Sequence, residues 1–177
     1  MSKKGLIHLY YGDGKGKTTA ALGLAVRAAG CGKNVVFVEF IKNWNSGEHS
    51  SLSQISNIQV FRGKAAGGKF IHEMTDEEKL ETKASQDECL EKALEQIEAK
   101  QCDILVLDEA IDAHKLGVLD TTLLEELIYN KPVSLELIIT GHDSDERLKN
   151  HADYVTEMKK HKHPYDEGIS ARRGIEF

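Results

Sequence analysis

The residues best suited to chemistry form a glycine-rich loop near the start of the chain. Residues 11–18 read Tyr-Gly-Asp-Gly-Lys-Gly-Lys-Thr and lie between an apolar run and a stretch rich in Ala and Leu. Glycines let the backbone turn tightly, so that successive N–H groups can point at phosphate oxygens. Lys17 supplies a cation to those phosphates, and Thr18 offers a hydroxyl to Mg²⁺. The loop therefore predicts binding of a nucleoside triphosphate such as ATP.

This loop departs from the usual mononucleotide-binding pattern at its first position. In that pattern a first glycine is separated by four residues from the Gly-Lys-Thr; here Tyr11 holds its place, and Gly12 and Gly14 follow. A glycine-rich turn that merely begins a helix is the alternative interpretation. The apolar run before the loop and the helical stretch after it favour the phosphate loop.

Two acidic residues follow a second apolar run. Residues 104–107 read Ile-Leu-Val-Leu and lead directly into Asp108 and Glu109. In phosphate-loop enzymes such a strand end holds Mg²⁺ or a catalytic water, and ligands bind at the carboxyl edge of open α/β sheets. A solvated loop is the alternative for an isolated Asp-Glu pair, but the phosphate loop favours a metal site.

Histidines occur in two further places that could belong to a site. Thr140-Gly141-His142 follows a third apolar run and could place a hydroxyl and an imidazole beside the phosphates, although an ordinary turn would also fit. His161 and His163 are two residues apart but lie among lysines, which favours a solvated basic segment over a metal site.

The elements that must position these residues alternate along the chain. Short apolar runs predict strands at residues 6–11, 34–41, 58–61, 103–107, 135–140 and 154–158. Helices are expected at residues 18–29, from the capping residue Thr75 onward, and at residues 121–129. The long helix would have an apolar stripe made of Leu80, Ala84, Leu90, Leu94 and Ile97. Alternating strands and helices predict an α/β fold, a mostly parallel sheet with helices on both faces.

Composition limits the class of protein. The chain has 177 residues, which suggests a single domain over residues 1–177, and its formal net charge of -6 argues against a nucleic-acid-binding protein. Three cysteines without a CxxC pair suggest small, mostly buried thiols in a reducing compartment. No run approaches the ~18 apolar residues of a membrane span, so a cytoplasmic location without membrane contact is expected.

Taken together, these segments resemble the ATP:corrinoid adenosyltransferases, which build the cobalt–carbon bond of adenosylcobalamin. The resemblance rests on segments in the family's order at residues 12–30, 35–42, 46–49, 107–110, 139–143 and 163–177, including GDGKGKTT and the terminal HPYDEG. GDGKGKTT looks like the family's own loop, which also lacks the leading glycine. The resemblance implies a phosphate-loop NTPase-like (RecA-like) fold.

The resemblance also implies a reaction in which a Co(I) corrinoid attacks C5′ of ATP and inorganic triphosphate leaves. The nucleotide would lie reversed relative to ordinary phosphate-loop ATPases. Lys17, Thr18 and Glu109 would be catalytic, with Mg²⁺ on Thr18 and Glu109, while Asp108 orients the site. The expected ATP-binding residues are Gly12, Asp13, Gly14, Lys15, Gly16, Lys17, Thr18, Thr19, Arg27 and Lys42.

Partners and alternatives follow from the same comparison. The family implies a homodimer and a cob(II)alamin reductase or flavodoxin-type electron donor. Longer members carry an N-terminal helical cover, which here is expected to be missing or supplied otherwise, and a Phe-x-Trp pair. Phe70 and His142 are the candidate corrinoid contacts, but no tryptophan accompanies Phe70, and Trp44 lies elsewhere. The rival interpretations are a phosphate-loop kinase or ATPase of unknown substrate, and a nucleotide-dependent regulatory module.

Overall fold

A six-stranded parallel sheet forms the centre of the computed structural model, which describes residues 4–42 and 47–176. Trp44 and Ser46 lie outside the described residues. The strands follow the order β3-β2-β4-β5-β1-β6, and each adjacent pair is parallel. The strands are β1 (Ile7–Tyr11), β2 (Val35–Glu39), β3 (Ile58–Arg62), β4 (Ile104–Asp108), β5 (Glu136–Gly141) and β6 (Tyr154–Glu157).

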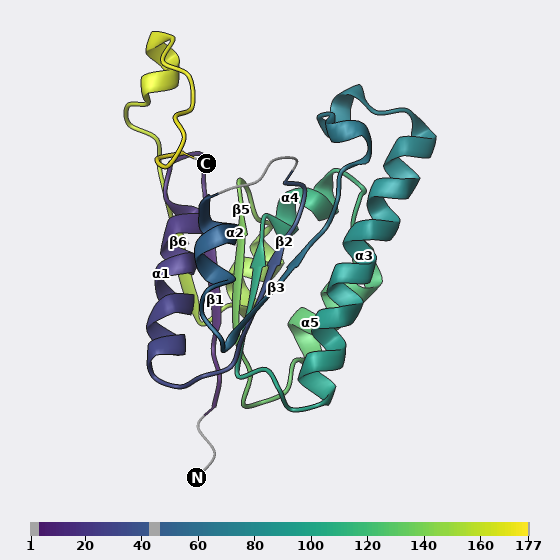
Figure 1. The fold of residues 1–177 in the computed structure, drawn as a ribbon, viewed down its shortest axis with the longest axis vertical. Helices are drawn as coiled ribbons and strands as arrows, with labels where there is room; N and C mark the ends of the chain where they lie inside the picture. The colour runs from purple at the N-terminus through teal and green to yellow at the C-terminus, as the bar shows by residue number, and fades with distance from the viewer. Residues whose placement is uncertain (1–3, 43–46, 177) are drawn as a thin grey trace.

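Helices cover both faces of the sheet, as Figure 1 shows. On one face lie α1 (Lys17–Gly30) and α2 (Gly47–Leu52); the other face carries α3 (Asp76–Glu98), α4 (Ala110–Lys115) and α5 (Thr121–Asn130). The short helix α6 (Glu146–His151) precedes β6. Single turns of 3₁₀ helix, η1 (Ala66–Gly68), η2 (Ile71–Glu73) and η3 (Pro164–Glu167), complete the described chain. The predicted α/β fold is confirmed.

The two-residue period of the strands divides the core into two layers. In β2, Val35 and Phe37 pack toward α1, whereas Val36 and Val38 pack into the larger cluster under α3, α4 and α5. The buried face of α1 consists only of alanines, which let the helix lie close to the sheet: Ala21, Ala25 and Ala29. Close packing of α1 fixes the position of the loop from which it begins.

The long helix α3 begins where the sequence predicts but buries a different stripe. Thr75 Oγ1 accepts a hydrogen bond from the Glu78 N–H, and Glu78 bonds back to the Thr75 N–H, which completes a capping box. Leu80 and Ala84 are exposed, so the predicted stripe is wrong in its first half. The buried positions there are Thr82 and Gln86, because their side chains bond to the loop after β3.

The structure also bears on the predictions for the cysteines and for membrane spans. Cys89 is buried and Cys102 half-buried, but Cys31 is exposed just after α1, so the prediction of a mostly buried thiol is wrong at that position. No helix among residues 4–42 and 47–176 is both long enough and apolar enough to cross a membrane.

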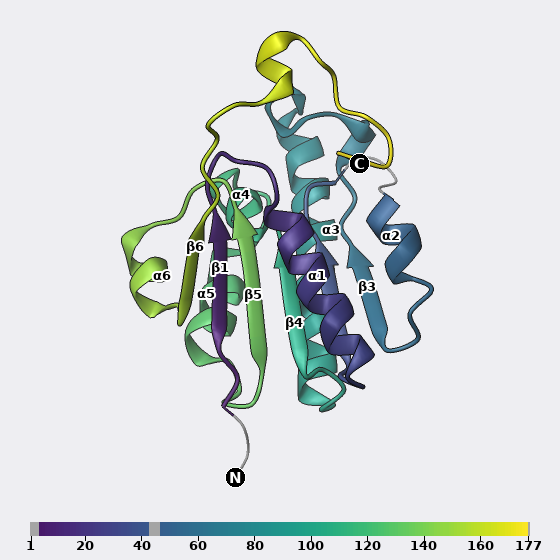
Figure 2. The same ribbon diagram turned by 90° about the vertical axis from the view of Figure 1, so that its left-hand side faces the viewer.

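The carboxyl ends of the strands meet at one edge of the sheet. The strand register pairs Glu39 with Asp108 and Tyr11 with both Gly141 and Glu157. Figure 2 shows the arm, the chain beyond β6 (residues 158–176), rising above this edge and returning, so that its last described residues lie above α1 and α2. The candidate site residues of the glycine-rich loop, of the end of β4 and of the end of β5 therefore lie together at this edge.

Candidate functional site

The glycine-rich loop is fixed by backbone contacts to the residues that directly follow β5 and β6. The Gly12 N–H donates to the carbonyl of His142 (2.9 Å), and the Gly14 N–H donates to the carbonyl of Met158 (2.6 Å). Gly12 has a φ of 115°, and a Cβ on Gly12 would lie 2.4 Å from the Met158 oxygen. Glycine is therefore required at this position both for backbone conformation and for space.

Lys17 curls back over the loop from the first turn of α1. Its Nζ donates to the carbonyl oxygens of Gly12 (2.6 Å) and Gly14 (3.0 Å), so the ammonium lies above the loop. Gly16, with a φ of 119°, turns the chain into the helix. The loop thus combines a cation with the positive end of a helix of 14 residues, an arrangement suited to phosphate groups.

Asp108 organises the base of the site from the end of β4. Its side chain is fully buried, and its two oxygens accept hydrogen bonds from the hydroxyls of Thr140 (2.9 Å) and Thr18 (3.2 Å). Lys42 Nζ lies 2.8 Å from the same carboxylate. These three contacts link Asp108 to Thr18, Thr140 and Lys42 at the base of the site.

Glu109 is the carboxylate that faces the cavity beside Asp108. It has a left-handed backbone (φ 60°), and its N–H donates to the Thr140 hydroxyl (2.8 Å). Burial and the negative charge of Asp108 together raise the pKa of Glu109 to about 7, against the lowering effect of Lys42. A carboxylate in this setting gains from a cation that occupies the cavity.

Lys42 connects the site to α2. Its Nζ lies 3.0 Å from Glu48 and is almost buried between Glu48 and Asp108. Burial lowers the pKa of Lys42, but the charge of Asp108 and a hydrogen bond to it raise that pKa well above its usual value. Lys42 is therefore a permanent cation at the wall of the site.

These groups surround a cavity of about 680 Å³. The phosphate loop and α1 form one wall, α2 another, and the returning C-terminal segment a third. The lining residues are Gly14, Lys15, Gly16, Lys17, Thr18, Thr19, Leu22, Lys42, Gly47, Glu48, Ser51, Glu109, His142, Gly174, Ile175 and Glu176.

The C-terminal segment reaches the phosphate loop through two contacts. Lys15 Nζ donates to the carbonyl of Ile175 (3.0 Å) and lies 3.5 Å from the carboxylate of Glu176. Asp13 accepts a hydrogen bond from the Lys160 N–H (2.9 Å), so its side chain binds the arm. Sequence reasoning missed this wall and the α2 wall, although residues 46–49 and 163–177 had the family's sequence pattern.

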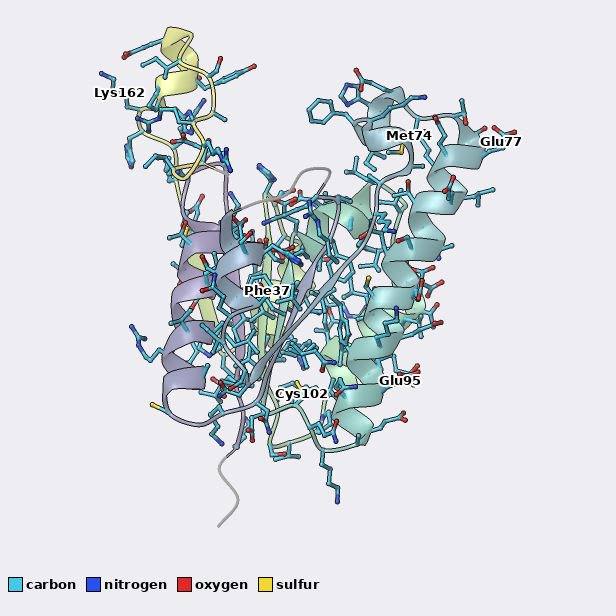
Figure 3. The ribbon with its side chains drawn as sticks, viewed as in Figure 1. Phe37, Met74, Glu77, Glu95, Cys102 and Lys162 are labelled. Carbon is cyan, nitrogen blue, oxygen red and sulfur yellow. The ribbon has the colours of Figure 1, made fainter. Side chains whose placement is uncertain are left out.

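The structure does not bring Arg27 or Phe70 into this cavity. Arg27 is exposed in the last turn of α1, about 15 Å along the helix axis from Lys17 at 1.5 Å per residue. The exposed Phe70 ring stacks on His72, with ring centroids 5.7 Å apart, just before η2. Figure 3 shows Met74, at the end of that segment, on the far side of the molecule from Lys162 in the arm.

The pair formed by His161 and His163 belongs to the arm. His163 Nδ1 accepts a hydrogen bond from the Tyr165 N–H (3.2 Å), which begins η3, while Lys160 and Lys162 pair with Asp166 and Glu167. In the part of the chain that the structure describes, no three His, Cys, Asp or Glu side chains gather as a metal-binding group.

A parallel sheet whose first strand leads through a glycine-rich loop into a helix, with an acidic strand end beside it, defines the phosphate-loop NTPase-like α/β class. Within that class, residues 3–177 match the family described as ATP:corrinoid adenosyltransferase BtuR/CobO/CobP. The chain belongs to the ATP:corrinoid adenosyltransferase family.

Curated relatives agree with this assignment. The corrinoid adenosyltransferase of Escherichia coli is 32% identical over 178 residues, covering 100% of this chain and 88% of the relative. The corrinoid adenosyltransferase CobA of Salmonella typhimurium is 35% identical over 184 residues, with the same coverage of both chains. A solved structure, the cytoplasmic domain of EssC, aligns with a TM-score of 0.56 at 19% identity over 97% of this chain and 34% of its own, which supports the fold alone.

Proposed function

We propose that this protein transfers the 5′-deoxyadenosyl group of ATP to the Co(I) centre of a corrinoid in the biosynthesis or salvage of adenosylcobalamin. The cobalt–C5′ bond forms as the C5′–O bond breaks; cobalt supplies the electron pair and becomes Co(III), and inorganic triphosphate leaves with the electrons of the broken bond. Family membership over nearly the whole chain supports this reaction. A kinase or ATPase is not favoured.

The cation-rich cavity is the observation that carries the proposal. A whole triphosphate is the leaving group, so the protein gains most from neutralising charge along its full length. Lys17 above the loop and Lys42 beside Asp108 supply two fixed cations to one cavity of about 680 Å³. Because Co(I) is itself the nucleophile, the reaction requires no protein base.

The residues around Thr18 fit a bound Mg²⁺. The Thr18 hydroxyl and the Glu109 carboxylate both line the cavity, and oxygen donors are the ligands that Mg²⁺ prefers. Mg²⁺, when bound there, supplies further positive charge to the triphosphate. Asp108 remains in the role of orienting group, since it accepts hydrogen bonds from Thr18 and Thr140 and pairs with Lys42.

The remaining expectations belong to the same proposal. ATP would contact Gly12, Gly14 to Thr19 and Lys42. Asp13 would act indirectly, by binding the arm. Arg27 and Phe70 would contact a substrate only outside this cavity. A cob(II)alamin reductase or flavodoxin-type donor would supply Co(I). The enzyme would work as a single-domain cytoplasmic homodimer without nucleic acid.

The first test mixes the purified protein with MgATP and chemically reduced cob(I)alamin, without oxygen and in dim light. Loss of the Co(I) spectrum with formation of adenosylcobalamin and inorganic triphosphate is the expected result. ADP or orthophosphate as the product, with no alkylated cobalt from any of several corrinoids, would instead identify a kinase or ATPase.

Lys17→Ala and Lys33→Ala form a matched pair for this assay. Lys17 lies over the phosphate loop, whereas Lys33 is exposed and pairs with Asp103 near the opposite ends of the strands. Loss of a charge-assisted contact to phosphate should weaken ATP binding by about a hundredfold in Lys17→Ala, and Lys33→Ala should behave as wild type. Equal ATP affinity in the two variants would contradict the assigned role of the loop.

A further inference from the structure

A carboxylate–imidazole pair stands on the cavity wall between β5 and α4. His142 follows the last residue of β5, and Asp112 lies in the first turn of α4. One carboxylate oxygen, Asp112 Oδ2, accepts from the His142 N–H (2.9 Å) and lies 3.2 Å from His142 Nδ1. The two bonds together fix both the backbone and the ring of His142.

The backbone of His142 is also part of the phosphate-loop structure. Its carbonyl accepts the hydrogen bond from the Gly12 N–H (2.9 Å). The imidazole is therefore placed relative to the loop by its own main chain and relative to α4 by Asp112. Such double attachment is what holds a functional side chain in a fixed geometry.

The free edge of the imidazole is available to a ligand. The side chain of His142 is 66% exposed and lines the cavity together with Lys17 and Glu109. Since Nδ1 faces Asp112, Nε2 lies on the opposite side of the ring, and within the described residues no hydrogen-bond partner is found for it. This edge is a donor when the ring carries its second proton.

The charged groups around His142 favour its protonated form. The hydrogen bond to Asp112 raises the pKa of His142 above its usual value, burial lowers it, and the negative charge of Asp112 raises it again. Lys17 has a lowering effect on this pKa and Glu109 a raising one. The carboxylate of Asp143, the next residue, lies 2.7 Å from Lys115 Nζ and is therefore paired with that lysine.

We propose that His142, oriented by Asp112, is a third cationic contact for the triphosphate, so that the affinity of the protein for triphosphate falls as the imidazole loses its proton. This inference rests on the proposed function. Of the two places that the sequence analysis allowed for His142, it takes the one beside the phosphates and not the corrinoid contact expected from the family resemblance. The step involves only binding: Nδ1 keeps its proton toward Asp112, so Nε2 of the neutral imidazole has no proton to donate to the triphosphate.

The test measures the affinity of the full-length protein for inorganic triphosphate by calorimetry between pH 6 and pH 9. Triphosphate itself titrates in this range, so the informative quantity is the ratio of wild-type to His142→Ala affinity at each pH. We expect the ratio to be about tenfold at pH 6, the value of a charge-assisted hydrogen bond, and to approach one by pH 9. His142→Lys should keep high affinity throughout.

Asp112→Asn separates charge from structure. The amide oxygen can still accept from the His142 N–H, so the backbone position is retained while the carboxylate charge is lost. The pH at which the affinity falls should therefore move to a lower value than in wild type. A His142→Ala profile identical to wild type, or His142→Lys that binds no better than His142→Ala, would overturn the inference.

Failure of this inference differs from failure of the proposed function. If wild type binds triphosphate and Lys17→Ala does not, but His142→Ala matches wild type at every pH, only the role of His142 is wrong. If wild type binds no triphosphate and forms no alkylated corrinoid, the proposed function itself is wrong.

Discussion

At the scale of residues, the site depends on charges that are held close together and partly removed from water. Asp108 is fully buried but is matched by Lys42 and two hydroxyls, whereas Glu109 beside it faces the cavity without such a set of partners among residues 4–42 and 47–176. Keeping a carboxylate charged in such a place costs folding free energy. Residues that bind ligands commonly carry such a cost, because stability and function compete at the same position.

Glu109→Gln tests this cost directly. The pKa of Glu109 is raised in the folded protein to about 7, so between about pH 4.5 and pH 7 the folded state binds more protons than the unfolded state, and stability falls as pH rises. We expect Glu109→Gln without ligands to be more stable than wild type at pH 8, by on the order of 2 kcal/mol, and equal to it near pH 4.5.

The same variant should lose the advantage that Mg²⁺ gives to ATP binding, because an amide replaces the anionic ligand. Urea unfolding at pH 4.5 and pH 8, together with ATP titrations with and without Mg²⁺, checks both effects. Asp143→Asn, which alters an exposed carboxylate paired with Lys115, is the matched control. An unchanged Mg²⁺ titration in Glu109→Gln would remove its role as a metal ligand.

Single residues of the site could be predicted where a short stretch of sequence is enough to mark them. Lys17, Thr18 and Glu109 are found from a loop pattern and a strand end, and the structure places them in one cavity. Glu39 was noticed only as an exception in an apolar strand, yet it is fully buried 3.4 Å from His49 and 3.9 Å from Arg62. That pairing joins separate segments, so no local pattern could indicate it.

At the scale of elements, the sheet was predictable and the short helices were not. Four central strands are apolar because both of their faces are covered, and such runs stand out in a sequence. The helices α2, α4 and α6 have six residues each, less than two turns, which is too short for a periodic apolar pattern. The return of the C-terminal segment depends on a contact between Lys15 and Ile175, 160 residues apart.

The N-terminus of α3 offers a prediction at the same scale. Thr75→Ala removes the hydroxyl that accepts from the Glu78 N–H, leaving one donor of the first turn without its partner. The expected loss is about 1 kcal/mol in the free energy of unfolding. Adenosyl transfer should be preserved, because Thr75 does not line the cavity of the described residues.

Thr122→Ala is the control for that substitution. Thr122 is exposed in the first turn of α5, where Asp120 is the capping residue. Alanine has the higher helix propensity, so this change should stabilise slightly, by a few tenths of a kcal/mol. Urea unfolding of both variants measures the change in the free energy of unfolding. An equal change in the two variants would show that the capping box contributes nothing to stability.

At the scale of the whole molecule, the described elements form one sheet with shared cores on its two faces. Both core clusters include residues of β2, β4 and β5, so neither face can lose its packing without exposing the other side of the same strands. The cavity lies at the carboxyl edge of that sheet and draws residues from the first helix to the C-terminal segment. Folding and ligand binding should therefore be coupled throughout the chain.

This coupling predicts a single cooperative unfolding transition that ligand binding shifts as a whole. Far-UV circular dichroism and calorimetry should report the same midpoint, with equal van't Hoff and calorimetric enthalpies. MgATP at one hundred times its Kd should add about 2.7 kcal/mol to the free energy of unfolding, which raises Tm by about 5–10 °C. Lys17→Ala should unfold near the wild-type temperature without ligand and show almost no shift with it. Two transitions in the free protein, with MgATP moving only one of them, would contradict the single domain and would place the nucleotide site in a separately folding part.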